Sequence, residues 1–397
     1  MLELLLALAF GIGIGVICGL LPGLHPNNTI PIILGLSFLF PPLFAAIVLI
    51  SAGIVNSFVS FIPSILIGAP EGDNALSALP GHRMLMQGRG YEALKLTVVG
   101  GFTSILFAMF TLPIFVFAVP SVYNFLRPNI QYLLIFVVAY MIFSEKGKGK
   151  FFAAAVFFLS GILGYLVLDV INIGNEALFP LLSGLFGLPM LLLALKNKTV
   201  LPETFSLESG QLRKRDVIKP AIIGSVAGVV AGLLPGIGSS QATVLAQAGN
   251  RDERTFLMAI AGVSAVDIMY SILALWIIGN PRSGIAVAVG TLVNIDMNMV
   301  FVFLSVILAA AGAGAFLTLA LSRSAVFAIR KIDYQKLCLY TFAFICILVF
   351  IFTGFLGLAV AGVALSVGLI PNLANIRRSH AMGCLILPTI LFFMGAA

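Results

Sequence analysis

Long apolar runs alternate with short polar breaks along the whole chain, and the order of the first half returns in the second. An apolar run of about 20 residues can cross a bilayer as an α-helix. The runs lie at about 4–21, 43–67, 96–119, 129–144, 151–171, 177–195, 220–234, 256–278, 299–321, 336–354, 355–371 and 381–397. Shorter runs between them cannot span. The pattern predicts an all-α polytopic membrane protein with about ten full spans and four broken or half segments.

One motif occurs in both halves and predicts the end of a helix. Three glycines at four-residue spacing lead into Leu-Leu-Pro22-Gly23, and the same pattern leads into Leu-Leu-Pro235-Gly236, 213 positions later. Glycines at this spacing share one helical face, where another helix can approach closely. Proline lacks an amide proton and glycine tolerates positive φ, so the helix is expected to stop here. We therefore expect a helix in each half that is broken within the membrane.

Polar residues follow each break before a short apolar run resumes. A helix, a break, a polar loop and a half-helix in each half are typical of transporter sites built from discontinuous helices. The first amide groups of a half-helix lack partners and carry partial positive charge, which suits an anion. We expect both loops to bind the anionic group of a substrate; kinks that serve only packing are the alternative. The expected substrate-binding residues are Pro22, Gly23, His25, Asn27, Asn28, Thr29, Pro235, Gly236, Ser239, Ser240 and Gln241.

Charged residues at membrane depth are further candidates for the substrate site. Glu71, Asp73 and Arg282 follow apolar runs, and Glu71 and Arg282 each come directly after Gly-x-Pro, 211 positions apart. A charge at this depth is costly, so it pairs with another charge or lines a hydrated path. The matched positions predict that these residues belong to a site between the two halves. A purely structural ion pair between Glu71 and Arg282 is the alternative.

Asn56 and Asp267 are the candidates for binding a coupling ion. They also lie 211 positions apart, each within a long apolar run. An ionised aspartate at membrane depth costs about 2.5–3.5 kcal/mol on insertion scales, so we expect Asp267 to face the protein interior or a hydrated cavity. Na⁺ or H⁺ would be the coupling ion. His25 could carry a proton, because histidine changes charge near neutral pH, or it is simply a hydrogen-bonded loop residue.

The repeated pattern divides the chain into two membrane repeats, residues 1–195 and 220–397, joined by a polar linker at 196–219. The linker carries six basic residues, which places it in the cytoplasm by the positive-inside rule. We expect the two structural repeats to be inverted relative to each other. The substrate would then bind near the bilayer midplane between the broken helices, and the repeats would move in an elevator or rocking motion.

Composition agrees with a multi-pass protein of the cytoplasmic membrane. Of the 397 residues, 60% are hydrophobic and 9% are charged, and the mean hydropathy is +1.14. No soluble domain buries that much apolar surface. The net charge of +7 is spread over loops and forms no nucleic-acid-binding patch, because fifteen of the 22 Lys and Arg residues fall in four loop clusters. These clusters are expected to face the cytoplasm.

Enzyme chemistry has little support in the sequence. There is no nucleophile–base pairing, no cluster with metal-ligand spacing and no Walker-type phosphate loop. The four cysteines lie in apolar runs, where they are expected to be core thiols. We therefore expect neither an enzyme nor a cofactor or bound metal, apart from Na⁺ as a possible coupling ion.

Five motifs in order resemble the large membrane subunit of tripartite tricarboxylate transporters, the TctA-like family. They are the two Gly-rich Leu-Leu-Pro-Gly motifs, Ile62-Pro-Ser-Ile-Leu-Ile-Gly-Ala-Pro-Glu-Gly72, Pro80-Gly-His-Arg-Met-Leu-Met-Gln-Gly-Arg-Gly90 and Gly279-Asn-Pro-Arg-Ser-Gly284. The resemblance covers nearly the whole chain. It implies a secondary carrier for a carboxylate, aided by a small membrane subunit and often fed by a periplasmic substrate-binding protein.

The sequence departs from the family's motifs at two places. His25-Pro26-Asn27-Asn28 stands where the family has Gly-Pro-Thr-Thr, and Glu71 and Asp73 stand where small and hydroxyl residues are usual. Acids at a site for a polyanion would repel it unless Arg282 or a cation offsets their charge.

The expected function is therefore the transport of a small organic anion by a carrier that is coupled to Na⁺ or H⁺. The carrier would contact membrane lipid and could form a homo-oligomer. A translocase for an anionic lipid carrier, such as a polyprenyl phosphate, is the alternative from another class. A substrate with such a long apolar chain would need a lateral opening to the bilayer, whereas a carboxylate carrier needs a closed hydrophilic cavity. A channel or a structural scaffold comes third, because neither requires paired broken helices.

Overall fold

The computed structural model describes residues 2–21, 33, 40–67, 78–171, 177–196, 213–233, 239, 242–243, 252–279, 283–330 and 334–395. These residues form helices and connecting turns, without strands, and eight of the helices are long and apolar enough to cross a membrane. Four shorter apolar helices accompany them. The predicted all-α membrane fold is confirmed.

The helices follow the order of the predicted runs. The first half contains α1 (Leu2–Leu20), α3 (Pro42–Val59), α4 (Phe61–Leu66), α5 (Ala78–Met86), α6 (Gly90–Phe110), α7 (Leu112–Leu126), η3 (Arg127–Asn129), α8 (Ile130–Phe143), α9 (Gly149–Tyr165), η4 (Leu166–Val170), α10 (Leu178–Leu182), η5 (Ser183–Gly187) and α11 (Leu188–Lys196). The second half contains α12 (Lys214–Leu233), α14 (Glu253–Ile277), α15 (Gly284–Leu292), α16 (Met297–Arg330), α17 (Tyr334–Leu373), η6 (Arg378–Met382) and α18 (Gly383–Phe393).

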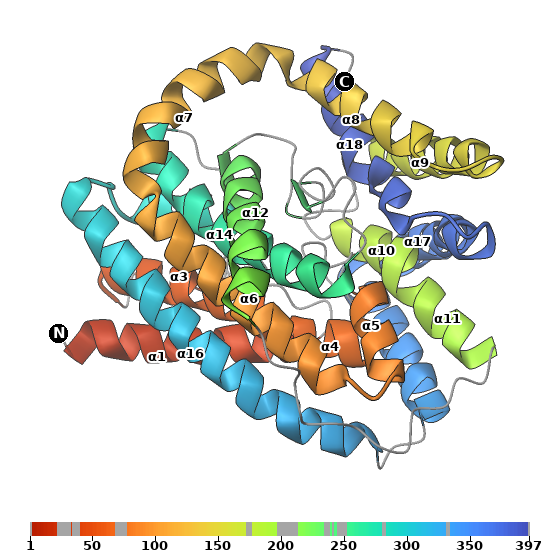
Figure 1. The fold of residues 1–397 in the computed structure, drawn as a ribbon, viewed down its shortest axis with the longest axis horizontal. Helices are drawn as coiled ribbons and strands as arrows, with labels where there is room; N and C mark the ends of the chain where they lie inside the picture. Colours follow the sequence, from red (N-terminus) through yellow and green to blue (C-terminus); the bar gives the residue numbers. More distant parts are fainter. Residues whose placement is uncertain are drawn as a thin grey trace.

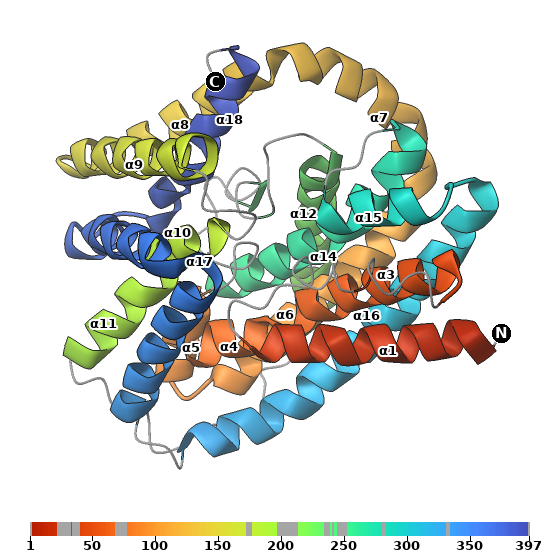
Figure 2. The same ribbon diagram turned by 180° about the vertical axis from the view of Figure 1, so that it is seen from behind.

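The helices gather in two bodies, which both views of the ribbon separate (Figures 1 and 2). The central body comprises α1, α3 to α6, α12 and α14 to α16, packed around the almost fully buried α3 and α14. The peripheral body comprises α8 to α11, α17 and α18. Figure 1 shows α7 as an arc that leads from the central body to α8. Pro120 lies within this helix and accounts for a bend, because proline cannot donate the helical hydrogen bond.

The two bodies do not coincide with the two halves of the sequence. In the central body, α6 from the first half packs on α12 and α14 of the second, and α16 from the second half packs on α1 and α3 of the first. In the peripheral body, α9 packs on α18, and α17 packs on α10, η5 and α11. Each half therefore completes the packing of the other.

The duplicated glycine motifs form two equivalent helix pairs in the central body. The helices α1 and α12 end at Leu20 and Leu233, two residues before the proline of each motif, as predicted. A methyl group added at Gly15 would lie 2.8 Å from Val55 Cβ on α3, and one at Gly228 would lie 2.6 Å from Val266 Cβ on α14. The two glycines, on α1 and α12, are 213 positions apart, and the two valines that they approach, on α3 and α14, are 211 positions apart. The pair α12–α14 thus makes the same contacts as α1–α3.

A second correspondence occurs in the peripheral body, where the sequence analysis had found none. Gly164 on α9 lies directly against the carbonyl oxygen of Cys384, and Gly368 on α17 against that of Leu185. The glycines are 204 positions apart and their partners 199. A second pair of contacts follows the same offsets: Gly383 lies against Phe157, and Gly184 lies against Ala361. The two glycines are 199 positions apart and their partners 204.

These close contacts predict a large difference between two glycines of α17. In Gly368→Ala the new methyl group would overlap the Leu185 carbonyl oxygen, whereas at Gly362 nothing lies within 4 Å. Overpacking costs about 1–3 kcal/mol, so Gly368→Ala should lower the melting temperature of the purified protein. Gly362→Ala should leave it unchanged or raise it slightly, since alanine favours a helix. Equal melting temperatures for the two variants would contradict this packing.

The expected division between spans 336–354 and 355–371 is confirmed within α17. Gly354 has φ 66° and ψ −161°, a conformation that breaks the helix and that glycine adopts without a steric penalty. The halves of α17 on either side of Gly354 are therefore two helices joined at a sharp kink.

Between two of the apolar runs, α5 ends at Met86 and α6 begins at Gly90, so that Glu92 lies in the first turn of a long helix and is only 4% exposed. The expected linker at 196–219 lies mostly outside the described residues, and the division into repeats 1–195 and 220–397 stays a prediction.

Candidate functional site

Most residues of the predicted substrate site lie outside the part of the chain that the structure describes. These are Pro22, Gly23, His25, Asn27, Asn28, Thr29, Glu71, Asp73, Pro235, Gly236, Ser240, Gln241 and Arg282. Three candidates are described: Asn56 on α3, Asp267 on α14 and Ser239 between α12 and α14.

The two central helices α3 and α14 meet close to Asn56 and Asp267. A methyl group added at Gly53 would lie 3.6 Å from Ile268 Cγ2 on α14 and 2.6 Å from Ile285 Cδ1 on α15. Asn56 is three residues beyond Gly53 on the same helix, and Asp267 directly precedes Ile268. Both candidates therefore lie within about one helical turn of the point where the two helices touch.

Asp267 is the centre of a polar cluster. The hydroxyl of Ser239 donates a hydrogen bond to Asp267 Oδ2 at 2.6 Å, and the hydroxyl of Ser271 donates one to Oδ1 at 3.3 Å. Asp267 is partly exposed, although residues 257–266 and 269–274 of the same helix are buried. The structure thus brings together Ser239, expected to bind substrate, and Asp267, expected to bind an ion.

The end of α12 lies beside this cluster. A methyl group added at Gly232 would be 2.8 Å from the carbonyl oxygen of Asp267 and 2.9 Å from the amide nitrogen of Ser271. The last four carbonyl groups of a helix lack helical partners and carry partial negative charge. A helix C-terminus beside a carboxylate and two hydroxyls is a favourable place for a small cation.

The first half has an equivalent cluster without the charge. Asn56 and Ser60 occupy the positions of Asp267 and Ser271 at an offset of 211, and they are 3% and 4% exposed. A methyl group added at Gly19 would lie 3.0 Å from the amide nitrogen of Ser60, so the end of α1 approaches this cluster as the end of α12 approaches the other. The carboxamide of Asn56 thus occupies the position that the carboxylate of Asp267 has in the second half.

The oxygen atoms of the Asp267 cluster suit an alkali cation or a proton better than a transition metal. Hard cations prefer oxygen ligands, whereas zinc and similar metals take nitrogen and sulfur. Among the described residues, no group of three or more His, Cys, Asp or Glu side chains could hold a metal ion.

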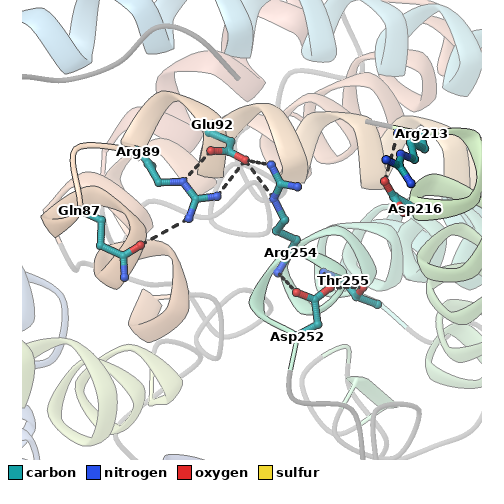
Figure 3. A network of polar contacts seen from close by, with 8 residues as sticks. All are labelled: Gln87, Arg89, Glu92, Arg213, Asp216, Asp252, Arg254 and Thr255. Carbon is teal, nitrogen blue, oxygen red and sulfur yellow. Dashed lines mark hydrogen bonds and ion pairs between the residues drawn. The ribbon is translucent and has the colours of Figure 1, made fainter. Parts of the chain in front are cut away.

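A separate ionic network joins the beginnings of α6 and α14 (Figure 3). Glu92 on α6 accepts hydrogen bonds from Arg89 Nε at 2.8 Å and Nη2 at 3.0 Å, and from Arg254 Nε at 3.0 Å and Nη2. Because Glu92 belongs to the first half and Arg254 to the second, the network ties the two halves together. The sequence alone does not reveal this pair, since the residues are 162 positions apart and no motif links them.

Further polar contacts surround this network. Asp252 caps α14 by accepting from the amide groups of Arg254 and Thr255, as Figure 3 shows. Although burial alone raises the pKa of Asp252, hydrogen bonds from the hydroxyl and amide of Thr255 and from the amide of Arg254 hold it below its usual value. Arg83 of α5 pairs with Glu253 at 3.4 Å, and the two side chains are 61% and 36% exposed. This end of the central body is thus rich in charge.

Comparisons with known proteins agree with the motifs. The chain matches the model of the tripartite tricarboxylate transporter TctA family over residues 5–383. It is 34% identical over 408 residues to an uncharacterized protein of Methanocaldococcus jannaschii, covering 98% of this chain and 99% of that protein. It is 25% identical over 247 residues to an uncharacterized 52.8 kDa protein of Agrobacterium vitis, covering 57% and 49% of the two chains. No solved structure matches it. The chain belongs to the tripartite tricarboxylate transporter TctA family.

Proposed function

We propose that this chain is a secondary active transporter that carries a small organic carboxylate across the cytoplasmic membrane together with Na⁺ or H⁺. Its family makes it the membrane component of a tricarboxylate-type transporter. The observation that carries the proposed coupling is the Ser239–Asp267–Ser271 cluster at the end of α12. A carboxylate at membrane depth is retained where it serves an ion or proton path.

The proposed substrate site lies between the two broken helices. The polar residues that follow each Leu-Leu-Pro-Gly motif would donate hydrogen bonds to the anion, together with the first amide groups of the half-helices. Neutral donors contribute on the order of 1 kcal/mol each, so they can hold a carboxylate and still release it. Arg282 would offset the charge of Glu71 and Asp73 at the same site.

Membership of this family implies partner proteins. A TctA-family chain is the large subunit of a tripartite transporter, which implies a small membrane subunit and a substrate-binding protein. We propose that both serve this chain, with the binding protein delivering the carboxylate to the outer side.

The distribution of basic residues supports inverted repeats. The turn between α8 and α9 carries Lys146, Lys148 and Lys150. The offset of 204 that relates α9 to α17 places Gly354 opposite Lys150, and the kink at Gly354 carries no charged residue. By the positive-inside rule, the turn faces the cytoplasm and the kink faces the outside. Equivalent turns on opposite sides of the membrane are what inverted repeats would produce.

Single cysteines at these two turns test the orientation. Phe355 beside the kink is 80% exposed, and Lys148 lies in the charged turn. In intact cells, a membrane-impermeant maleimide should label Phe355→Cys, whereas Lys148→Cys should be labelled only after the membrane is permeabilised. The chain without an introduced cysteine gives the background. Labelling of both variants from the same side would reject the inverted arrangement.

The substrate class is tested with liposomes that contain the purified protein. Uptake of labelled carboxylates is compared with the movement of a polyprenyl phosphate between the two leaflets. The proposal expects uptake of at least one carboxylate and no movement of the lipid. Movement of the lipid without carboxylate uptake would instead identify a lipid translocase.

A further inference from the structure

The two halves present the same pair of positions at the end of their broken helix but differ in charge. Ser60 on α3 and Ser271 on α14 correspond at an offset of 211, and each lies against the last glycine of its own broken helix. One turn before them, Asn56 corresponds to Asp267. The first cluster, Asn56 with Ser60, is called the neutral half-site below, and the second, Asp267 with Ser271 and Ser239, the acidic half-site.

Both half-sites lie near the point where α3 meets α14. A methyl group added at Gly53 on α3 would lie 3.6 Å from Ile268 Cγ2 on α14. Asn56 and Asp267 each lie within about one turn of these residues along their own helices. Ligands bound at the two half-sites would therefore be neighbours and would feel each other's charge, since a water-poor interior screens charges weakly.

The chemistry of the two side chains favours different ligands. A carboxylate such as that of Asp267 accepts hydrogen bonds and attracts a cation, and it repels an anion nearby. The carboxamide of Asn56 carries two N–H donors and no charge, so it can donate to a substrate carboxylate. A second carboxylate at this position would attract a second cation and repel the substrate.

We propose that Asn56 is a specificity-determining residue that holds the substrate's carboxylate, while Asp267 holds the coupling cation. This inference rests on the proposed function and assigns Asn56 to the anion instead of the coupling ion. A cation bound first at Asp267 neutralises the charge that would otherwise repel the anion at the neighbouring half-site. Cation binding therefore raises anion affinity, and by linkage the anion raises cation affinity equally. The pair of half-sites binds one cation for each anion.

The test measures how strongly the purified full-length protein binds potassium succinate, tartrate and citrate at several concentrations of NaCl. Choline chloride keeps the ionic strength constant, and calorimetry gives the affinities. A matched series at several pH values covers coupling to protons. For the wild type, the logarithm of affinity for the best-bound probe should rise with a slope of about one against the logarithm of cation concentration below saturation.

Asn56→Asp should lower the affinity for that probe at least tenfold at low cation concentration and raise the slope to about two, because a second cation must bind. Asn56→Ala removes the donors without adding charge, so it should lower the affinity and keep the slope at one. Ser57→Ala is the control, because Ser57 is also buried but its hydroxyl donates to Ile54 O within the same helix. This variant should bind like the wild type.

Two outcomes would overturn the inference in different ways. Wild-type affinity and slope in both Asn56 variants would reject the role of Asn56 and leave the carboxylate carrier standing. If the wild type binds none of the three probes, the proposed function itself fails, and the inference fails with it.

Discussion

Replacing Asp267 by asparagine is expected to abolish the dependence of transport on the coupling cation while the protein still folds. Asparagine has nearly the shape of aspartate and keeps one oxygen that can accept the hydrogen bond from Ser239. It carries no charge, so the cation loses its main electrostatic partner. The change also removes a charge that is costly at membrane depth, and the fold is therefore not penalised.

The measurement is carboxylate uptake into liposomes with an imposed Na⁺ or pH gradient. Wild-type protein should accumulate the carboxylate above its external concentration, whereas Asp267→Asn should at most equilibrate it. The matched control is Asp296→Asn, because Asp296 is exposed and accepts from Met299 N at 2.8 Å as the cap of α16. Asparagine caps a helix as well as aspartate does, so coupling should persist. Unchanged gradient dependence in Asp267→Asn would remove this residue from the mechanism.

The largest loss of stability is expected from Glu92→Gln. Glu92 is buried and accepts hydrogen bonds from two arginines, one of which belongs to the other half of the chain. Without the carboxylate, the guanidinium groups of Arg89 and Arg254 would face each other with no intervening negative charge. Removing one member of a buried ionic group typically costs about 3–5 kcal/mol. Because both arginines are about one-third exposed, water offsets part of this, and we expect the lower end of the range.

The control for this prediction is Glu253→Gln in the same region. Glu253 pairs with Arg83, but the two side chains are 36% and 61% exposed. Solvated ion pairs contribute about 0–1 kcal/mol. Thermal unfolding of the purified protein should therefore show a clearly lower melting temperature for Glu92→Gln. The melting temperature of Glu253→Gln should stay close to that of the wild type. Equal stabilities of the two variants would mean that the Glu92 network does not hold α6 and α14 together.

The sequence predicted those features that depend on local chemistry. The Pro-Gly steps located the ends of α1 and α12, and the glycine spacing identified the faces that pack on α3 and α14. The division at Gly354 was also predicted, as the boundary between the apolar spans 336–354 and 355–371. In each case, the deciding residues lie within a few positions of the feature.

Features that depend on contacts between the halves were not predicted. Glu92 resembles an interface residue by its neighbours in sequence, and only the approach of Arg254 from α14 explains its burial. His380 follows two basic residues in the sequence, but it is 1% exposed and its Nε2 lies 3.1 Å from Glu145 Oε1. The matched contacts of Gly164 and Gly368 were missed because the residues around them differ between the halves, so no motif repeats.

The central claim is that this chain couples the movement of a carboxylate to that of a cation. The most direct test is the accumulation of a carboxylate by liposomes. These contain only the purified protein and, where needed, its small membrane subunit and binding protein. With an inward Na⁺ or proton gradient, at least one labelled carboxylate should accumulate above its external concentration, and an ionophore that collapses the gradient should release it. Carboxylate that only equilibrates, at a rate indifferent to either gradient, would contradict the claim.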